Sequence, residues 1–339
     1  MTQDGFPVDL SAASEIFWAP PGACDVADPF ESVIVTAFFD LRRAEWSCEQ
    51  GAPSKFKRSI DQYFGYFANL APLKNAFVVF TEPKFAAEAL QARRRHGLEH
   101  RTVLVTVDRL FETGPVAQAV ADARKRMTPR FHQWLLQPEK PEFREPRYPV
   151  LTGLKAAFVN TALRLSLVKA EQLAWIDFGY CRDRGPFDRA DPWRFDAGGR
   201  MNLFCMAEPD HRPIASVVRF GEPYFHGAHM IAPTAAWPDF AAEMARAFEA
   251  LLAFDLIDDD QTLMLMAWRR RPDRYRLHGI PLANYRDLFR EFNCEAPLPG
   301  HRARTRSGPG GSVLSEEARI ALKRLEWRFK RVRARLGYP

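Results

Sequence analysis

Acidic side chains at two places in the sequence are the residues best suited to chemistry. Asp177 follows the apolar run 173–176, and three consecutive aspartates precede a glutamine at 258–261. Carboxylate oxygens are the ligands that Mg²⁺ and Mn²⁺ prefer, and these ions commonly bridge protein carboxylates and substrate phosphates. A run of aspartates is also typical of the first turn of a helix, where the macrodipole favours negative charge. The run therefore allows both a catalytic and a purely structural interpretation.

Asp177 lies where a strand is predicted to end. The run 173–176 before it is apolar, and Gly179 comes two residues later. Aspartate is a poor strand residue, and burying its charge without a partner is costly. Ligands of open α/β sheets bind in the crevice at the carboxyl ends of the strands, and a glycine there lets the backbone approach a ligand. Asp177 either serves such a site or only caps a turn, and the residues leave both interpretations open.

Histidine and basic residues supply further candidates. His226 and His229 flank Gly227, but the segment is predicted to be a strand or loop, where their spacing of three does not favour a zinc site. A single histidine beside the glycine, His226, fits a substrate contact better. Arg43 and Lys155 lie near a strand end and a helix start and could hold a diphosphate, although a solvated surface position is the simpler explanation for each alone. The sequence contains no G-x-S-x-G elbow, which argues against a serine hydrolase.

The first half of the chain alternates predicted strands and helices, the pattern of βαβ units on a parallel sheet. No G-x-G-x-x-G or G-x-x-x-x-G-K-[ST] follows any of these strands, which argues against NAD-binding and P-loop folds. Ser54 is the predicted N-cap of the first helix. The strands are predicted at 32–39, 76–80, 101–107 and 173–180, and the helices at 55–70, 84–95, 116–127 and 151–166.

The second half is less regular, and the two ends of the chain differ from the middle in composition. Short strands are predicted at 201–206 and 215–220, and helices at 237–254 and 262–268. The predicted organisation is an irregular N-terminal lead-in at 1–30, a main domain at 31–296, a Pro/Gly/Arg-rich linker at 297–314 and a basic amphipathic helix at 315–339.

Positive charge is concentrated at the C-terminal end. Residues 301–339 carry 11 Lys/Arg and 3 Asp/Glu, whereas the other 300 residues carry 37 basic and 39 acidic side chains. A nucleic-acid-binding fold would place its basic patch on the folded domain, so no nucleic-acid partner is expected. The final helix is expected to dock on an anionic membrane surface, on a partner helix or on its own domain.

The expected location is the cytoplasm, with the basic helix allowing peripheral attachment to the inner membrane. No stretch approaches the roughly 18 uninterrupted apolar residues of a spanning helix. The N-terminus lacks the basic and apolar regions of a signal peptide. The five cysteines are scattered without a C-x-x-C pair, which fits a reducing compartment.

Several stretches, taken in order, resemble one family of proteins. They are V-I-V-T-A-F-F-D-L-R at 33–42, V-V-F-T-E at 78–82, W-I-D-F-G-Y at 175–180, F-H-G-A-H-M-I at 225–231 and D-D-D-Q at 258–261. Together they are similar to the HtrL/YibB (WlaTC-type) family over residues 31–280. That family is regarded as glycosyltransferase-like and is associated with genes for bacterial surface polysaccharide or lipopolysaccharide.

The resemblance implies a GT-A-type fold, an α/β domain whose Rossmann-type mixed, mainly parallel sheet is flanked by helices. It also implies that Asp177 binds a divalent cation, Mn²⁺ or Mg²⁺, although this sequence has D-F-G where many GT-A enzymes have D-x-D. One aspartate of the D-D-D-Q run would be the base of an inverting enzyme. The implied donor-binding residues are Thr36, Ala37, Phe38, Arg43, Lys155, Asp177, Gly179 and Gly227, and the implied catalytic residues are Asp258, Asp259, Asp260, Gln261 and His226.

The expected function is transfer of a sugar from a nucleotide-sugar donor to a glycan or lipid-linked acceptor of the cell surface, such as lipopolysaccharide. The alternative is a non-catalytic GT-A-like protein that binds a saccharide or a protein partner. The missing second aspartate after residue 177 favours this alternative. Formation of product from any donor would separate the two interpretations.

Overall fold

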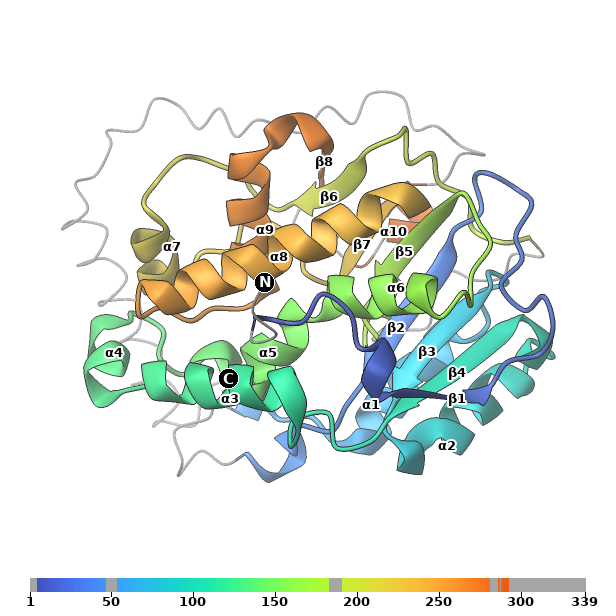
Figure 1. Ribbon diagram of the computed structural model, residues 1–339, viewed down its shortest axis with the longest axis horizontal. Helices are drawn as coiled ribbons and strands as arrows, with labels where there is room; N and C mark the ends of the chain where they lie inside the picture. The colour runs from blue at the N-terminus through green and yellow to red at the C-terminus, as the bar shows by residue number, and fades with distance from the viewer. Residues whose placement is uncertain (1–4, 47–53, 183–190, 281–285, 287, 293–339) are drawn as a thin grey trace.

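The computed structural model describes residues 5–46, 54–182, 191–280, 286 and 288–292, and the strands of this part of the chain form one sheet (Figure 1). In chain order they are β1 (Ser14–Trp18), β2 (Val33–Phe38), β3 (Phe77–Thr81), β4 (Thr102–Val107), β5 (Gln172–Ile176), β6 (Met201–Cys205), β7 (His229–Pro233) and β8 (Tyr275–Gly279).

The sheet is mixed and mainly parallel, as the sequence predicts. Its order is β1-β4-β3-β2-β5-β7-β6-β8. The neighbours β4, β3, β2 and β5 run parallel to one another, as do β6 and β8, whereas β1 and β7 are antiparallel to their neighbours. The carboxyl ends of β2 and β5 therefore lie at the same edge of the sheet as the amino end of β7, and this edge carries the site described below.

Helices cover both faces of the sheet. Figure 1 views the face on which α6 and α8 lie. Among the described helices, none has both the length and the apolar character needed to cross a membrane. The helices are α1 (Ile60–Leu70), α2 (Pro83–Arg94), α3 (Gly114–Arg126), α4 (Pro129–Trp134), α5 (Arg147–Gly153), α6 (Lys155–Arg164), α7 (Ile214–Phe220), α8 (Trp237–Ala253), α9 (Asp260–Arg270) and α10 (Leu288–Glu291).

The central strands are apolar on both sides because each side of the sheet has its own hydrophobic core. On β2, Val33 and Val35 belong to the core beneath α6 and α8, and Ile34 belongs to the core beneath α1 and α2. Successive side chains of a strand point to opposite faces, so a strand covered on both faces has no polar alternation. This is the pattern from which β2, β3, β4 and β5 are predicted, and all four are confirmed.

Two predictions about local structure are wrong. Residues 215–220 form helix α7 and not a strand, because Pro213 starts the helix and Gly221, in the left-handed conformation at φ 58°, ends it. The expected irregular lead-in contains β1, an edge strand that pairs with β4. The expected linker at 297–314 and basic helix at 315–339 lie outside the described residues.

Two helices begin at residues other than the predicted ones. Helix α1 begins after Ser59 and not after Ser54, because Ser59 and Gln62 form a capping box. The expected helix at 151–166 is divided into α5 and α6, which meet at Leu154. Helix α5 starts before 151 because Pro149 is in its first turn, where a missing N–H costs no hydrogen bond. Lys155 is consequently the first residue of α6.

Candidate active site

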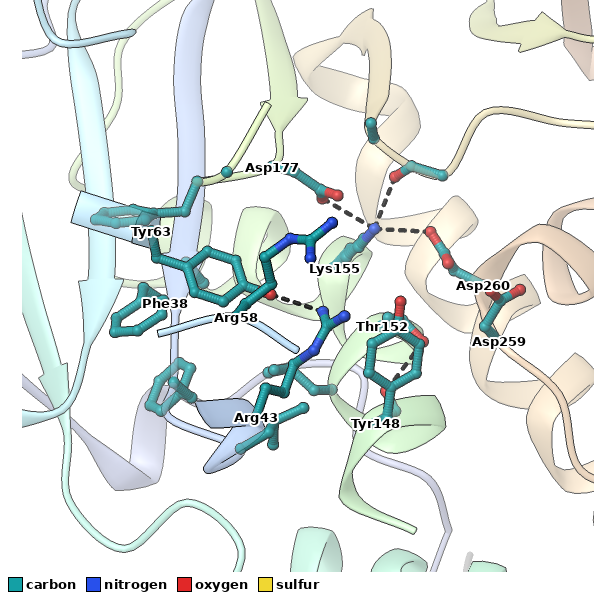
Figure 2. Close-up of a pocket in the computed structure, with 18 of the residues that line it drawn as sticks. Phe38, Arg43, Arg58, Tyr63, Tyr148, Thr152, Lys155, Asp177, Asp259 and Asp260 are labelled. Carbon is teal, nitrogen blue, oxygen red and sulfur yellow. Dashed lines mark hydrogen bonds and ion pairs between the residues drawn. The ribbon is translucent and has the colours of Figure 1, made fainter. Parts of the chain in front are cut away.

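A pocket of about 310 Å³ opens at the carboxyl ends of β2 and β5 (Figure 2). Its walls come from the residues after these two strands, the starts of α1, α6 and α9, and the turn before β7. Eleven of the thirteen residues expected from the sequence line it. They are Ala37, Phe38, Arg43, Lys155, Asp177, Gly179, His226, Gly227, Asp259, Asp260 and Gln261. Thr36 and Asp258 are not among the lining residues.

The pairing of β5 with β7 brings Asp177 beside Gly227. Ile176 at the end of β5 pairs with His229 at the start of β7, and the Asp177 N–H continues the ladder by donating to the Ala228 carbonyl at 2.9 Å. Because the strands are antiparallel, the residue that leaves one strand meets the residue that enters the other. Asp177 is about one third exposed and faces the pocket (Figure 2).

Lys155 lies at the centre of the site, and its ammonium group is surrounded by oxygen atoms (Figure 2). Nζ is 2.7 Å from the Gly227 carbonyl oxygen, 2.9 Å from Asp177 Oδ1 and 2.9 Å from Asp260 Oδ2. An ammonium group has three hydrogens, so these acceptors use all of its donors. Lys155 was expected to hold phosphate, but its hydrogen bonds go to the protein itself.

The charges of this cluster follow from burial and from mutual attraction. Burial by itself lowers the pKa of Lys155, but attraction to Asp177 and Asp260 outweighs it and raises the pKa, so the lysine stays charged. Burial raises the pKa of Asp260 to about 7, although Lys155 opposes this shift. Near neutral pH the cluster therefore contains the Lys155 ammonium and a partly protonated Asp260.

Gly227 is required by the close approach of Asp260. A Cβ atom placed on Gly227 would lie 2.3 Å from Asp260 Oδ2. That oxygen cannot move far, because the Asp260 side chain is only 3% exposed and is bonded to Lys155. Gly179 lies in a similar position, since a Cβ there would be 3.1 Å from the ring of Tyr63. Both glycines thus allow other groups to pack against the backbone.

The three aspartates at 258–260 have different surroundings. Asp259 is the N-cap of α9, where its carboxylate accepts the Gln261 N–H, and burial raises its pKa to about 7. Asp258 is buried and accepts hydrogen bonds from the Asp259 N–H and, at 2.7 Å, from the Thr262 hydroxyl. Asp259 therefore fits both the structural and the chemical interpretation of the run, Asp260 lines the pocket with it, and Asp258 does not.

The histidines before and within β7 are neutral and buried. Burial lowers the pKa of His226 to about 4, so its imidazole is uncharged near neutral pH. His229 is fully buried, and its ring packs edge-to-face against Tyr180 and Phe204. Only His226 lines the pocket.

The end of β2 contributes a wall and not a polar contact. The Phe38 ring stacks on Phe178 at 5.1 Å and lies 5.2 Å from the Tyr63 ring. Thr36, expected to bind the donor, is fully buried, and its hydroxyl has no hydrogen-bond partner. Thr36 belongs to the β2 interior, two residues before the wall at Phe38.

A divalent cation at Asp177 was expected, and the surroundings of this carboxylate do not fit one. Asp177 Oδ1 already accepts from Lys155 and, at 2.8 Å, from the Trp175 indole N–H. The neighbouring carboxylate, Asp260, is bonded to the same ammonium. Within the described ranges, no group of three His, Cys, Asp or Glu side chains is arranged to hold a metal ion. The cation between the two carboxylates is the side chain of Lys155.

Comparison with known proteins places the chain among bacterial proteins. The family model described as "Bacterial protein of unknown function (HtrL_YibB)" matches residues 30–294. The chain belongs to the HtrL_YibB family. Protein HtrL of Escherichia coli (strain K12) is 29% identical over 274 residues, which cover 77% of this chain and 92% of that protein. The crystal structure of mouse xyloside xylosyltransferase 1, apo form, is similar with a TM-score of 0.35 and 12% identity, covering 79% of this chain and 99% of that one.

Six polar side chains of the HtrL_YibB pocket were not expected from the sequence: Asp40, Arg58, Tyr63, Tyr148, Thr152 and Arg182. Tyr63 and Tyr148 come from the first turns of α1 and α5. Arg182 comes soon after the W-I-D-F-G-Y stretch, and this nearness to Asp177 is a sequence signal for its place in the pocket. Arg58, just before α1, carried no such signal, because only the folding of the 54–60 segment beside β2 brings it to the site.

Proposed function

We propose that this HtrL_YibB protein is a glycosyltransferase that uses a nucleotide-activated sugar. The observation that carries the proposal is a pocket at the carboxyl ends of β2 and β5 that combines three arginines with the Lys155–Asp177–Asp260 cluster. Ligands of α/β sheets bind in this crevice. A guanidinium group matches the geometry of a phosphate, so the arginines suit the diphosphate of such a donor.

Asp259 is the proposed general base. It lines the pocket, and its pKa of about 7 is close to the value at which a base works best near neutral pH. In an inverting reaction, the acceptor hydroxyl forms a bond to the anomeric carbon of the donor sugar and gives its proton to Asp259. The bond between that carbon and the diphosphate oxygen breaks at the same time, and its electron pair leaves with the nucleoside diphosphate.

The arginines and the lysine have separate parts in this reaction. Arg43, Arg58 and Arg182 would stabilise the negative charge that develops on the leaving diphosphate. Lys155 would keep Asp177 and Asp260 in place, since all of its donors are used by the protein. His226, uncharged in its buried position, is suited to contact a sugar hydroxyl.

The acceptor and the location are also part of the proposal. On the family resemblance, the acceptor is a glycan or lipid-linked glycan of the cell surface, and the enzyme works in the cytoplasm. The basic segment at 315–339 would hold it at the anionic inner membrane.

The test is donor binding and turnover by the full-length chain. Isothermal titration with UDP- and GDP-linked sugars should identify one nucleotide class that binds, and release of the nucleoside diphosphate in the presence of acceptor should follow. Asp177→Asn should weaken both, whereas Asp122→Asn on α3, away from the pocket, should change neither. Failure of every donor to bind would refute the proposal, and binding without turnover would favour the non-catalytic alternative.

A further inference from the structure

We infer that the donor diphosphate is held by arginine side chains without a divalent cation, because Lys155 occupies the position between Asp177 and Asp260 that the cation would need. The inference rests on the proposed function and names how the same pocket binds its leaving group. It is carried by the contacts of the lysine and of the three arginines.

The Lys155 ammonium lies between the carboxylates of Asp177 and Asp260. Nζ lies 2.9 Å from an oxygen of each carboxylate, so it bridges them as a cation would. Mg²⁺ binds oxygen at about 2.0–2.1 Å, and two carboxylates can bind one ion only if nothing else lies between them. The Lys155 side chain is 8% exposed, and its third donor is used by the Gly227 carbonyl. The ammonium is therefore held in this position by burial and by three acceptors.

The carboxylates of the pocket are already partly engaged by the protein. Asp177 Oδ1 accepts two hydrogen bonds, from Lys155 and from Trp175, which leaves Oδ2 facing the pocket. Asp259 and Asp40 also line the pocket, and each has one oxygen that accepts a backbone N–H, from Gln261 and from Arg42 respectively. Among the described residues these carboxylates form no group of three that could hold a metal ion, so an ion here would depend largely on the substrate for its ligands.

The arginines supply the missing positive charge. In the part of the chain that the structure describes, Arg43, Arg58 and Arg182 all line the pocket and none has an ion pair with a carboxylate. The Arg43 guanidinium donates to the Phe56 carbonyl and, at 2.7 Å, to the Tyr63 hydroxyl. These neutral acceptors fix its orientation and leave its charge uncompensated. Figure 2 shows Arg43 and Arg58 pointing toward the middle of the pocket.

The remaining contacts of these arginines are also neutral. Arg58 Nη1 donates to the backbone carbonyls of Lys55 and Lys57, and Arg182 lies over the Tyr66 ring at 5.9 Å. Three unpaired guanidinium groups around one pocket repel one another unless an anion binds between them. Arginine pairs with phosphate oxygens through two parallel hydrogen bonds, which is the geometry a diphosphate offers.

The first experiment measures binding of free UDP, GDP and CDP to the full-length chain by isothermal titration, in EDTA and in Mn²⁺. The expected result is a similar dissociation constant in both buffers. Arg58→Ala should weaken binding about tenfold or more, as expected for loss of a charged hydrogen bond. Lys57→Ala, the exposed neighbour with the same charge that does not line the pocket, should leave it unchanged.

The outcomes separate this inference from the proposed function. Binding that appears only with Mn²⁺ would overturn the inference and leave the glycosyltransferase proposal standing. Absence of nucleotide binding in both buffers would overturn both. Equal loss in the Arg58 and Lys57 variants would show a diffuse electrostatic effect and would refute a built phosphate subsite.

A second experiment tests the lysine directly. Lys155→Ala should free both carboxylates, so Mn²⁺ alone should raise the melting temperature of this variant and not that of the wild-type protein. Lys140→Ala, which removes a partly buried lysine paired with Glu142 instead, should show no such response. Stabilisation of the wild-type protein by Mn²⁺ would contradict the inference, as would a folded Lys155→Ala protein that Mn²⁺ does not stabilise.

Discussion

Substitution of Gly227 by alanine should destabilise the protein through one defined contact. The new methyl group would lie 2.3 Å from Asp260 Oδ2. To restore an ordinary contact, the carboxylate would have to retreat by about 1 Å or more. Such a shift lengthens the 2.9 Å contact with Lys155 beyond hydrogen-bonding distance. Overpacking costs about 1–3 kcal/mol and breaking a buried ion pair about 3–5 kcal/mol, so a loss near 3 kcal/mol is expected.

Urea unfolding of Gly227→Ala and three comparison proteins, Gly65→Ala, Asp260→Ala and the Gly227→Ala/Asp260→Ala double variant, measures this effect. Gly65→Ala is the matched control, because Gly65 lies inside α1 with no atom within 4 Å of an added Cβ. That control should be stabilised by about 0.5–1 kcal/mol, the usual gain from replacing a helix glycine. Combining Gly227→Ala with Asp260→Ala should cost less than the sum of the two single changes, because the clash is then absent. Exact additivity, or a Gly227→Ala protein as stable as the wild type, would refute the close-approach explanation.

Three further predictions concern the strand interior and the aspartates. Thr36→Val should raise stability by about 1 kcal/mol in urea unfolding, because it removes a buried hydroxyl that lacks a partner, and nucleotide affinity should not change. Asp259→Asn, which keeps an N-cap side chain, should lower sugar transfer about 10²–10⁴-fold while donor affinity stays the same; equal loss of both would argue against a base. The pKa of Asp260 is raised from 3.8 to about 7 on folding, so its native state binds the proton more tightly and stability should fall as pH rises from about 4 to about 7. Unfolding midpoints across this range should fall less steeply for Asp260→Asn, and an unchanged slope would contradict this shift.

The parallel part of the sheet was predictable because its strands are apolar on both faces. Such runs are typical of the central strands of a parallel sheet, and their separation by helix-length segments indicates the topology. Helix α7 was assigned wrongly for the related reason that Ile214–Phe220 is also a short, β-branched apolar run. A run of this length does not distinguish strand from helix, and the flanking Pro213 and Gly221 were the better guides.

The part of the site that follows the ends of strands was predictable from strand topology. Asp177 and Phe38 are found in the pocket because each comes at the carboxyl end of a parallel strand. The sequence could not tell Asp258 from Asp259 and Asp260, since consecutive residues at a helix start point in different directions. Nor could it show that Lys155 bonds to the protein and not to a ligand, because its acceptors are distant in the chain.

The Lys155 contacts join four segments that are far apart along the chain. The lysine begins α6, Asp177 follows β5, Gly227 precedes β7, and Asp260 begins α9. If any one of these segments comes loose, a charged or polar group loses its partner in the protein interior, which is costly. The four segments are therefore expected to fold onto one another cooperatively. Formation of the cluster would then assemble the pocket in a single step.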